Sequence, residues 1–396
     1  MSENLMARRD FMKTGVTGLG GFAMLAANEI KPEEKKQSPP KLIYRTLGKT
    51  GIKVPVIGMG AAATPEVVEA ALNAGLMLFD TSQAYGRGQH ESMMGKLTKG
   101  RPRNSFVVCT KIWPMRDRIT GVFTQEVKED EFLKGVEGSL KRLEVEYADL
   151  FLIHDVWTVE GLFFKSLMNG LEKAKKLGLV KFIGAAFHRE EVKLIRATID
   201  SQIYDVIQVT YNFKQRHYLQ VREAIAQAAQ AGLGVMAMKV MGGADAQDHL
   251  RPVNAKAALK WVLQDPNVHT TIPGFKNFEE LNVDISVMED LSLTDKEKEH
   301  LQKQASIPGL YCQGCGQCMK QCSARIPIPD LMRAYMYTYG YRDVKQGYEL
   351  ITSLDLPRSI CQDCSQCSVK CSIGFDVPGK IRNIARLRDV PSEFVV

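Results

Sequence analysis

Eight of the nine cysteines in this 396-residue chain fall into two copies of one spacing, C-x-x-C-x-x-C-x-x-x-C. Three thiols at every third residue can wrap one loop around three corners of a 4Fe–4S cube, whereas the fourth thiol lies beyond that loop. Where two such cubes occur together, the fourth thiolate of each run completes the other cube. The spacing therefore predicts two 4Fe–4S clusters, held by the thiolates of Cys312, Cys315, Cys318, Cys322, Cys361, Cys364, Cys367 and Cys371.

Zinc and disulfide bonds are the alternative uses of these cysteines. Zinc sites usually take separated cysteine pairs, and a disulfide framework rarely needs two identical four-cysteine runs. The two runs are followed by similar tails, residues 323–329 and 372–378, which indicates an internal pseudo-twofold with Cys371 on the first cube and Cys322 on the second. Helices are predicted between the runs at Asp330–Tyr339 and Val344–Thr352. We therefore expect residues 306–396 to form a small, mainly helical, ferredoxin-like iron–sulfur domain.

The N-terminus carries a pattern typical of protein export. Arg8-Arg9-Asp10-Phe11-Met12-Lys13 precedes a glycine-rich apolar stretch that is too short to span a membrane stably. The pattern resembles a twin-arginine signal, whose route carries folded proteins and so suits clusters assembled before export. A disordered basic N-terminus is the alternative. We expect residues 1–29 to be the signal, 30–41 a linker, and the protein to be periplasmic or exported, with a cytoplasmic location as the alternative.

Between residues 42 and 305, short apolar runs alternate with helical patterns. Eight such β-α units in about 250 residues predict an α/β fold, a (β/α)8 TIM barrel. A doubly wound sheet is the alternative, but no G-x-G-x-x-G opens the first helix. Tyr44–Lys53 is expected to be a hairpin that closes the barrel floor. Strands are predicted at Val54–Gly60, Met77–Ser82, Phe106–Lys111, Asp149–His154, Lys181–Ala186, Val206–Tyr211, Gly234–Val240 and Thr270–Pro273, and helices at Glu126–Leu143, Glu160–Leu177 and Tyr218–Ala231.

Composition excludes some partners. The formal net charge of +7 is largely offset if two oxidised clusters with four thiolates each bring about −2 apiece. We therefore expect no nucleic-acid binding. After the N-terminal segment no apolar run is long enough for a transmembrane helix, so membrane contact is expected only through an uncleaved signal. Cys109, in the middle of a predicted strand, is expected to be a buried core residue.

Polar residues follow successive predicted strands, where a barrel places its active site. Reduction of a carbonyl by hydride transfer leaves an alkoxide that needs a proton, and tyrosine is a poor acid at neutral pH unless its anion is stabilised. A lysine beside the phenol provides that stabilisation, and a carboxylate keeps the lysine charged and oriented. We predict Tyr85 as proton donor, Lys111 as the neighbouring charge, Asp80 as its orienter, and His154 as hydrogen-bond partner of the substrate oxygen. A barrel salt bridge and a structural histidine are the alternatives.

Over about residues 43–300 these motifs resemble the aldo-keto reductases. Residues 79–86, FDTSQAYG, are similar to the family's F-D-T-A-x-x-Y-G, Thr110-Lys111 to its T-K, and residues 149–154, DLFLIH, to its D-x-x-x-x-H. The resemblance implies a catalytic set of Asp80, Tyr85, Lys111 and His154. It also implies a hydride exchange between a nicotinamide nucleotide, NADP or NAD, and a small-molecule carbonyl or sugar-like substrate.

The nucleotide site departs from the family's pattern. Gly184-Ala185-Ala186-Phe187 stands where the family has G-x-S-N, so two ligands of the nicotinamide carboxamide are replaced. Met238 stands where an aromatic ring commonly stacks on the nicotinamide. Lys276 favours the 2′-phosphate of NADP, whereas Glu280, in place of an arginine, favours NAD, and both nucleotides stay open. The cofactor-binding residues that the resemblance implies are Gln208, Lys239, Gly242, Gly274 and Lys276.

A hydride carries two electrons and each cube takes one, so two cubes match one hydride. The sequence thus predicts an oxidoreductase that passes electrons through its clusters to or from a redox partner protein or a quinone. Because nicotinamide nucleotides are not supplied outside the cytoplasm, an exported protein would have to hold its nucleotide tightly. The alternatives are an electron-transfer protein and an exported sugar- or polyol-binding protein, each with the barrel as a scaffold, and clusters with a structural role only.

Overall fold

The computed structural model of the protein describes residues 42–60, 64–124, 128–243, 253–307, 310–357, 360–361, 364 and 367–395. The chain divides into two units, Met1–Pro40 and Lys41–Val396, and every described residue belongs to the second. The predicted signal and linker lie outside the described residues. Within the described ranges, none of the helices combines the length and the apolar character needed to cross a bilayer.

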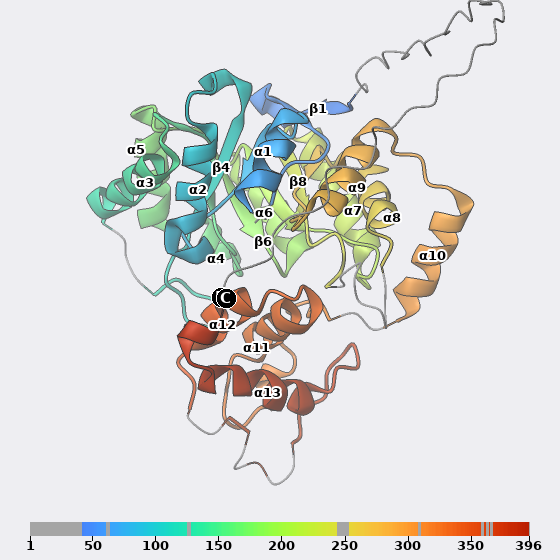
Figure 1. Cartoon of the computed structure of the whole chain (residues 1–396). Helices are drawn as coiled ribbons and strands as arrows, with labels where there is room; N and C mark the ends of the chain where they lie inside the picture. Colours follow the sequence, from blue (N-terminus) through green and yellow to red (C-terminus); the bar gives the residue numbers. More distant parts are fainter. Residues whose placement is uncertain are drawn as a thin grey trace, which may run out of the picture. The chain divides into compact units, whose positions relative to one another are not determined.

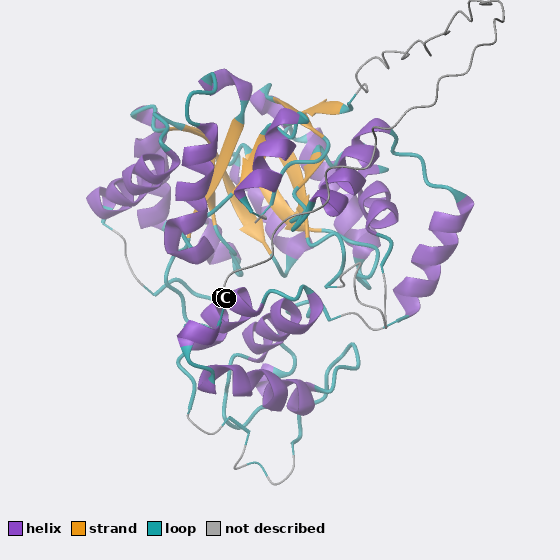
Figure 2. Cartoon of the chain, in the orientation of Figure 1, coloured by secondary structure: helices purple, strands orange, loops and turns teal. Residues whose placement is uncertain are grey.

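Seven parallel strands form one sheet in the order β3-β4-β5-β6-β7-β8-β9, and the helices surround it (Figure 1, Figure 2). Nearly all of their residues are buried, as expected for a parallel sheet that is covered on both faces. The observed strands agree with seven of the predicted ones to within a few residues. Their bounds are β3 (Leu78–Asp80), β4 (Val107–Ile112), β5 (Ala148–Ile153), β6 (Val180–Phe187), β7 (Val206–Thr210), β8 (Gly234–Met238) and β9 (Thr270–Thr271).

The predicted first strand, Val54–Gly60, does not form one continuous strand of the sheet. Its first residues belong to β2 (Lys53–Pro55), which pairs antiparallel with β1 (Tyr44–Thr46) and confirms the predicted hairpin. The following residues link the two edges of the sheet, because Gly58 N donates to Thr271 O and Met59 N donates to Leu78 O, both at 2.8 Å. A Cβ on Gly58 would lie 2.9 Å from Leu78 O, so glycine is needed for this close approach. The curled parallel sheet is consistent with the predicted barrel.

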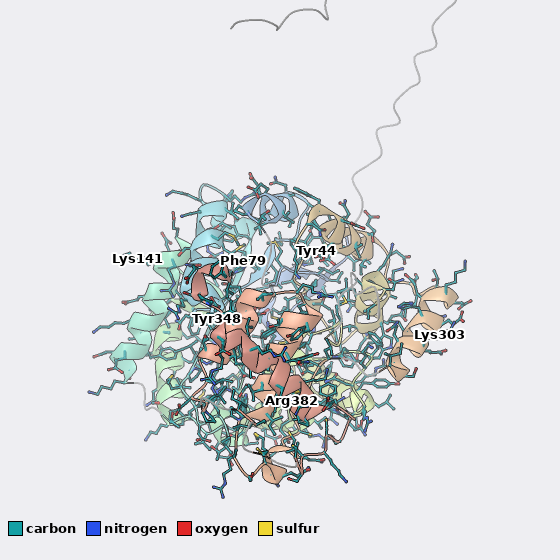
Figure 3. The ribbon with its side chains drawn as sticks, turned by 60° about the horizontal axis from the view of Figure 1, so that its bottom comes forward. Tyr44, Phe79, Lys141, Lys303, Tyr348 and Arg382 are labelled. Atoms are coloured by element: carbon teal, nitrogen blue, oxygen red, sulfur yellow. The ribbon has the colours of Figure 1, made fainter. Side chains whose placement is uncertain are left out.

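Helices alternate with the strands and pack against the outer face of the sheet. The predicted helix Glu160–Leu177 is in fact two helices, because the backbone of Phe164 is extended while its ring packs against Phe123 at 5.6 Å between centroids. Solvent-facing residues such as Lys141 of α3 and Lys303 of α10 project outward from these helices (Figure 3). The helices of this part are α1 (Pro65–Asn73), α2 (Gln89–Thr98), α3 (Glu129–Leu143), α4 (Val159–Leu162), α5 (Lys165–Lys176), α6 (Glu191–Ser201), α7 (Tyr218–Gln230), α8 (Ala255–Leu263), α9 (Phe278–Glu289) and α10 (Asp295–Ser306).

Three helices dominate the C-terminal segment. They are α11 (Ile328–Tyr335), which continues into the π-turn η5 (Met336–Gly340), α12 (Val344–Thr352) and α13 (Val377–Ala385). Buried side chains such as Leu331, Ile351 and Ile381 form a core of their own between them. α12 has its predicted bounds. α13 was not predicted, although its capping residue Asp376, which accepts from Gly379 N, and the proline after it are helix-start features.

Candidate active site at the strand ends

The structure brings the four predicted catalytic residues together. Asp80 ends β3, Lys111 lies in β4, His154 follows β5, and Tyr85 begins the short helix η2 (Tyr85–Gly88). Lys111 Nζ donates to Asp80 Oδ2 at 2.6 Å and to the carbonyl oxygen of Thr81 at 2.9 Å. The same ammonium lies 5.2 Å from the centre of the Tyr85 ring. The centres of the Tyr85 and His154 rings are 5.7 Å apart. Parallel strands deliver these side chains to one end of the sheet.

A left-handed turn positions the Tyr85 ring. Gly86, Arg87 and Gly88 follow it with φ of 55°, 52° and 86°, a run that turns the chain sharply before α2. A Cβ on Gly88 would lie 2.6 Å from Arg142 Nε, so glycine serves both the positive φ and the close packing. The sequence run Tyr-Gly-Arg-Gly is therefore needed to present the phenol beside Lys111.

Burial and charge set the protonation of this pair. Burial lowers the pKa of Lys111, but Asp80 and Tyr85 together raise it above its ordinary value, so the ammonium is retained. Burial raises the pKa of Tyr85, while Lys111 acts in the opposite direction through its charge and a hydrogen bond. In this enclosed arrangement burial outweighs Lys111, and Tyr85 is a neutral phenol with a proton to donate.

His154 is a neutral imidazole. Its side chain is buried, and burial together with the Lys111 charge holds its pKa well below the ordinary histidine value. His154 Nδ1 lies 3.1 Å from the hydroxyl of Ser82, which leaves Nε2 for a substrate oxygen. Trp113 packs edge-on against the imidazole, with 4.5 Å between ring centroids. Ser82 was missed as a site residue, although it replaces the alanine in the F-D-T-A motif and so could have been noticed.

Two of the predicted nucleotide-binding residues are engaged by other side chains. Gln208 Nε2 donates to Asp80 Oδ1 at 3.0 Å, so in this structure it holds the catalytic carboxylate. Lys239 Nζ lies 3.4 Å from the Tyr337 hydroxyl, and 4.9 Å and 5.6 Å from the ring centres of Tyr337 and Tyr341. These two tyrosines come from η5 and the turn after it, so the C-terminal segment covers this side of the barrel mouth.

The other three nucleotide residues line the same side. Lys276 Nζ donates to Tyr341 O, and its backbone N donates to Glu280 Oε2 at 2.6 Å. Gly242, with φ of 59°, packs against the Lys214 side chain, and Gly274 is exposed. Two lysines and left-handed glycine backbone are a donor set that suits phosphates. A nucleotide bound there would replace the contacts that Tyr337 and Tyr341 now make.

The cysteines of the two runs are interleaved. Cys312, Cys315, Cys318 and Cys371 line one small hollow, so the first run is joined by the last cysteine of the second. Burial and the neighbouring thiols raise the pKa of Cys318 to about 12. The pKa of Cys361 is raised by burial and by Cys364, Cys322 and Cys367, which therefore lie near it.

The geometry of these thiols bears on the kind of metal site. In the described part of the chain, no group of three or more histidine, cysteine, aspartate or glutamate side chains is arranged to hold a metal ion. Four thiols from the two runs at one hollow match the ligand set predicted for the first cluster, and the two clusters themselves stay a prediction. Cys109, by contrast, is fully buried inside the barrel, as expected.

Comparisons with known proteins bear on the family of the chain. The model of the Aldo/keto reductase family matches residues 58–251. An aldo-keto reductase of Mycolicibacterium vanbaalenii is 30% identical over 230 residues, which are 54% of this chain and 76% of that protein. L-galactose dehydrogenase of Arabidopsis thaliana is 29% identical over 160 residues, 36% of this chain, and the match spans only 48% of that relative.

A solved structure shows the same fold. The holo form of an aldo-keto reductase from Bacillus halodurans superposes with a TM-score of 0.54 at 20% identity, over 68% of this chain and 98% of that one. The fold, the matched residues and the relatedness along most of a curated reductase lead to one conclusion. This chain belongs to the aldo/keto reductase family.

Proposed function

We propose that the chain is an NAD(P)-dependent oxidoreductase that interconverts a small carbonyl compound and its alcohol, with Tyr85 as the proton donor and acceptor. The observation that carries this proposal is the buried Lys111 ammonium between the Asp80 carboxylate and the Tyr85 ring. A buried cation at this place favours the phenolate, which lets the phenol give up a proton to a developing alkoxide. Membership of the family supports the same chemistry.

The residues divide the work of proton transfer. During carbonyl reduction, negative charge develops on the substrate oxygen and the Tyr85 hydroxyl donates its proton to that oxygen. Lys111 stabilises the phenolate that remains, and Asp80 holds Lys111 in place. Neutral His154 donates a hydrogen bond from Nε2 to the same oxygen and fixes its position. A bound nicotinamide nucleotide would supply or accept the hydride at this mouth, with Lys239 and Lys276 holding its phosphates.

The substrate proposed is a small sugar-like carbonyl compound. A relative that acts on L-galactose by its name supports a sugar-like substrate. Trp113 offers an apolar ring next to His154, suited to the face of a sugar. Two other aromatic side chains near the strand ends are less suited to a sugar. The Trp157 ring is covered by the Arg189 guanidinium, 3.4 Å from the ring centre, and Phe163 is exposed.

We further propose two 4Fe–4S clusters that exchange single electrons with a redox partner protein or a quinone. What supports them is the repeated spacing together with the interleaved thiols, Cys371 beside the first run and Cys322 near Cys361. Four thiolates around one hollow supply the ligands that a cube needs. The proposal also requires export with the clusters in place, in keeping with the twin-arginine pattern of the sequence.

Substitution of Tyr85 by phenylalanine tests the barrel chemistry. With galactose-type sugars and NAD(P) as probes, we expect Tyr85→Phe to lower kcat by ~10²-fold or more while iron content stays at the parental level. Tyr44→Phe is the matched control, because Tyr44 lies in β1 at the opposite end of the barrel and should leave kcat unchanged. Parental turnover in Tyr85→Phe would remove the barrel mouth as the reacting site.

Iron analysis and a cysteine variant test the clusters. Anaerobically purified protein should contain close to eight irons per chain, and Cys371→Ser should remove about half of them. Cys109→Ser is the control, because Cys109 lies inside the barrel and should leave the iron content unchanged. Stoichiometric zinc without iron would contradict the cluster proposal.

One observation favours a second function, electron transfer or sugar binding with the barrel as a scaffold. Tyr337 and Tyr341 cover the phosphate-binding lysines, and Gln208 is held by Asp80. If these contacts persist, a nucleotide has no access. Isothermal titration of the apo protein with NADP and NAD distinguishes the two, since a scaffold would bind neither nucleotide.

A further inference from the structure

Charged side chains form a layer where α11 and the Cys312–Cys315 loop meet the loops after the barrel strands. Of the arginines in this layer, Arg116 and Arg189 are buried, and Arg118 and Arg333 are half-buried. Arg116, Arg118 and Arg189 contribute from loops that follow barrel strands, and Arg333 contributes from α11. Arg333 Nη1 lies 3.0 Å and Arg116 Nη1 3.6 Å from Asp155 Oδ2, and Asp155 is fully buried. These four arginines are called the interfacial arginines below.

Among the described residues, the layer carries more positive than negative charge. Asp155 and Asp330 are both fully buried, and Asp330 lies 3.9 Å from Arg118, so two carboxylates face the four interfacial arginines. His188 lies 3.0 Å from Asp155 and adds no charge at neutral pH, because burial lowers its pKa to about 3. A surplus of buried positive charge is costly unless an anion compensates for it.

Arg189 has the least complete hydrogen bonding of the interfacial arginines, with two unpartnered nitrogens among the described residues where Arg116 and Arg118 have one each. Its side chain is 4% exposed, and its Nε and Nη2 have no hydrogen-bond partner within the described part of the chain. A Cβ on Gly314, two residues after Cys312, would lie 3.2 Å from Arg189 Nε. The guanidinium therefore lies against the Cys312–Cys315 loop, and it is near enough to Cys312 for the thiol's charge to act on it.

We propose that Arg189 donates hydrogen bonds to the first 4Fe–4S cluster, the one held by Cys312, Cys315, Cys318 and Cys371, and raises its reduction potential. This inference rests on the clusters of the proposed function. An oxidised cube with four thiolates carries about −2, which offsets the surplus charge of the layer. Reduction adds one more negative charge, so a buried cation and hydrogen bonds to sulfur favour the reduced state.

The same placement assigns an order to the two clusters. The first cluster lies against Arg189, which follows β6 and stacks on Trp157 of the loop after His154. Of the thiols near Cys361, those of Cys364 and Cys367 are exposed, whereas in the first set only that of Cys315 is. The first cluster is thus the one that exchanges electrons with the barrel mouth, and the second is the one that faces an external partner.

The test compares midpoint potentials of the full-length, cluster-loaded protein in redox titrations followed by electron paramagnetic resonance. Arg189→Gln removes the charge at similar size, and we expect the reduction equilibrium constant of one cluster to fall by about tenfold or more, equivalent to ~59 mV for one electron. Arg189→Lys keeps the positive charge but loses the planar guanidinium with its several donors, and we expect the reduction equilibrium constant to fall by only about threefold. Arg216→Gln is the matched control, because Arg216 donates to Ser372 O at 2.8 Å beside the same hollow but is exposed, and both potentials should stay unchanged.

The outcomes separate the inference from the function on which it rests. If Arg189→Gln keeps its iron content and shows the midpoint potentials of the parent, the inference is wrong but the cluster proposal is not contradicted. A parent protein without iron–sulfur signals would overturn the clusters and the inference together. If Arg189→Gln does not retain the first cluster, Arg189→Lys decides, and an unchanged potential in that variant would refute the hydrogen bond.

Discussion

The hydroxyl of Ser82 bears on which nitrogen of His154 can serve the substrate. It accepts from Ala84 N at 3.2 Å, and its one proton can go either to His154 Nδ1 at 3.1 Å or to the carbonyl oxygen of Lys111 at the longer distance of 3.4 Å. A hydroxyl that donates to Nδ1 keeps the proton of the neutral imidazole on Nε2, where it can bind a substrate oxygen. We expect Ser82→Ala to lower kcat by about tenfold, because this tautomer is no longer fixed.

The measurements on Ser82→Ala must distinguish a change of the His154 tautomer from a loss of folding stability. Nitrogen-15 chemical shifts of His154 should move toward the other tautomer, while the melting temperature and the iron content stay near the parental values. Ser92→Ala is the control, since the Ser92 hydroxyl only donates to Gly88 O at 3.2 Å within the start of α2. Equal kcat in Ser82→Ala and the parent would show that Ser82 has no part in orienting the imidazole.

His188 gives the fold a dependence on acid. Burial lowers its folded-state pKa to about 3, below the ordinary value for an unfolded chain. The unfolded state therefore binds the proton more readily, so the contribution of His188 is fully present above about pH 6.5 and is lost as pH falls toward about 3. Between pH 7 and pH 5 the free energy of unfolding should fall by up to about 2 kcal/mol on account of His188.

Chemical denaturation at the two pH values measures this loss. His188→Gln cannot take up the proton, so its free energy of unfolding should depend less on pH than that of the parent. His300→Gln is a suitable control, because His300 lies on α10, is only partly buried, and accepts from Asn254 N at 3.0 Å away from the barrel mouth. An identical pH dependence in parent and His188→Gln would assign the acid sensitivity to other groups.

The elements whose apolar residues recur at a strand or helix period were predicted well. The elements interrupted by an unusual backbone conformation were not. β4 and β5 are buried, largely apolar runs with Lys111 next to the end of the first and His154 directly after the second, so their place and the convergence of these two side chains followed from the sequence. The break at Phe164 was missed, because a helical pattern continues through it while only the packing on Phe123 favours an extended backbone. Contacts distant in sequence, such as Gln208 with Asp80, leave no local pattern at all.

The π-turn η5 covers one of the predicted phosphate-binding lysines. Tyr337, which it carries, is buried and stacks over the Lys239 ammonium. We expect Tyr337→Ala to uncover that ammonium and to tighten NAD(P) binding by about threefold to tenfold, because the nucleotide then has no ring to displace. Quenching of protein fluorescence on titration with the nucleotide measures the affinity.

A neighbouring tyrosine provides the control for this variant. Tyr339 belongs to the same turn but is 39% exposed and stacks on Tyr335, with 4.4 Å between ring centroids. Tyr339→Ala should therefore leave nucleotide affinity at the parental level. Weaker binding in Tyr337→Ala would mean that this ring belongs to the nucleotide site and does not merely cover it.

At the scale of the whole molecule, barrel and C-terminal segment are parts of one compact unit. Tyr311 OH donates to His188 O at 2.9 Å and lies 3.1 Å from Thr210 Oγ1, and Arg333 pairs with Asp155, so polar contacts join the two. These contacts hold the C-terminal segment against the barrel while a nucleotide displaces Tyr337 and Tyr341, so we expect slow exchange of the nucleotide. If the chain is exported, slow exchange is what it needs, because no nucleotide pool outside the cytoplasm can refill its site.

Export itself is the last expected outcome. If Arg8 and Arg9 are the recognised address, changing both to lysine should keep the protein in the cytoplasm with its clusters intact, since those residues precede every described element. Cell fractionation with iron analysis of each fraction measures this, and Lys13→Arg, which keeps the arginine pair, is the control. The exported parent should release nearly one nicotinamide nucleotide per chain on denaturation, and Lys239→Ala should lower that occupancy because a phosphate partner is lost. Exported protein that carries full clusters but no nucleotide, and gains no activity when one is added, would favour the scaffold function over the reductase.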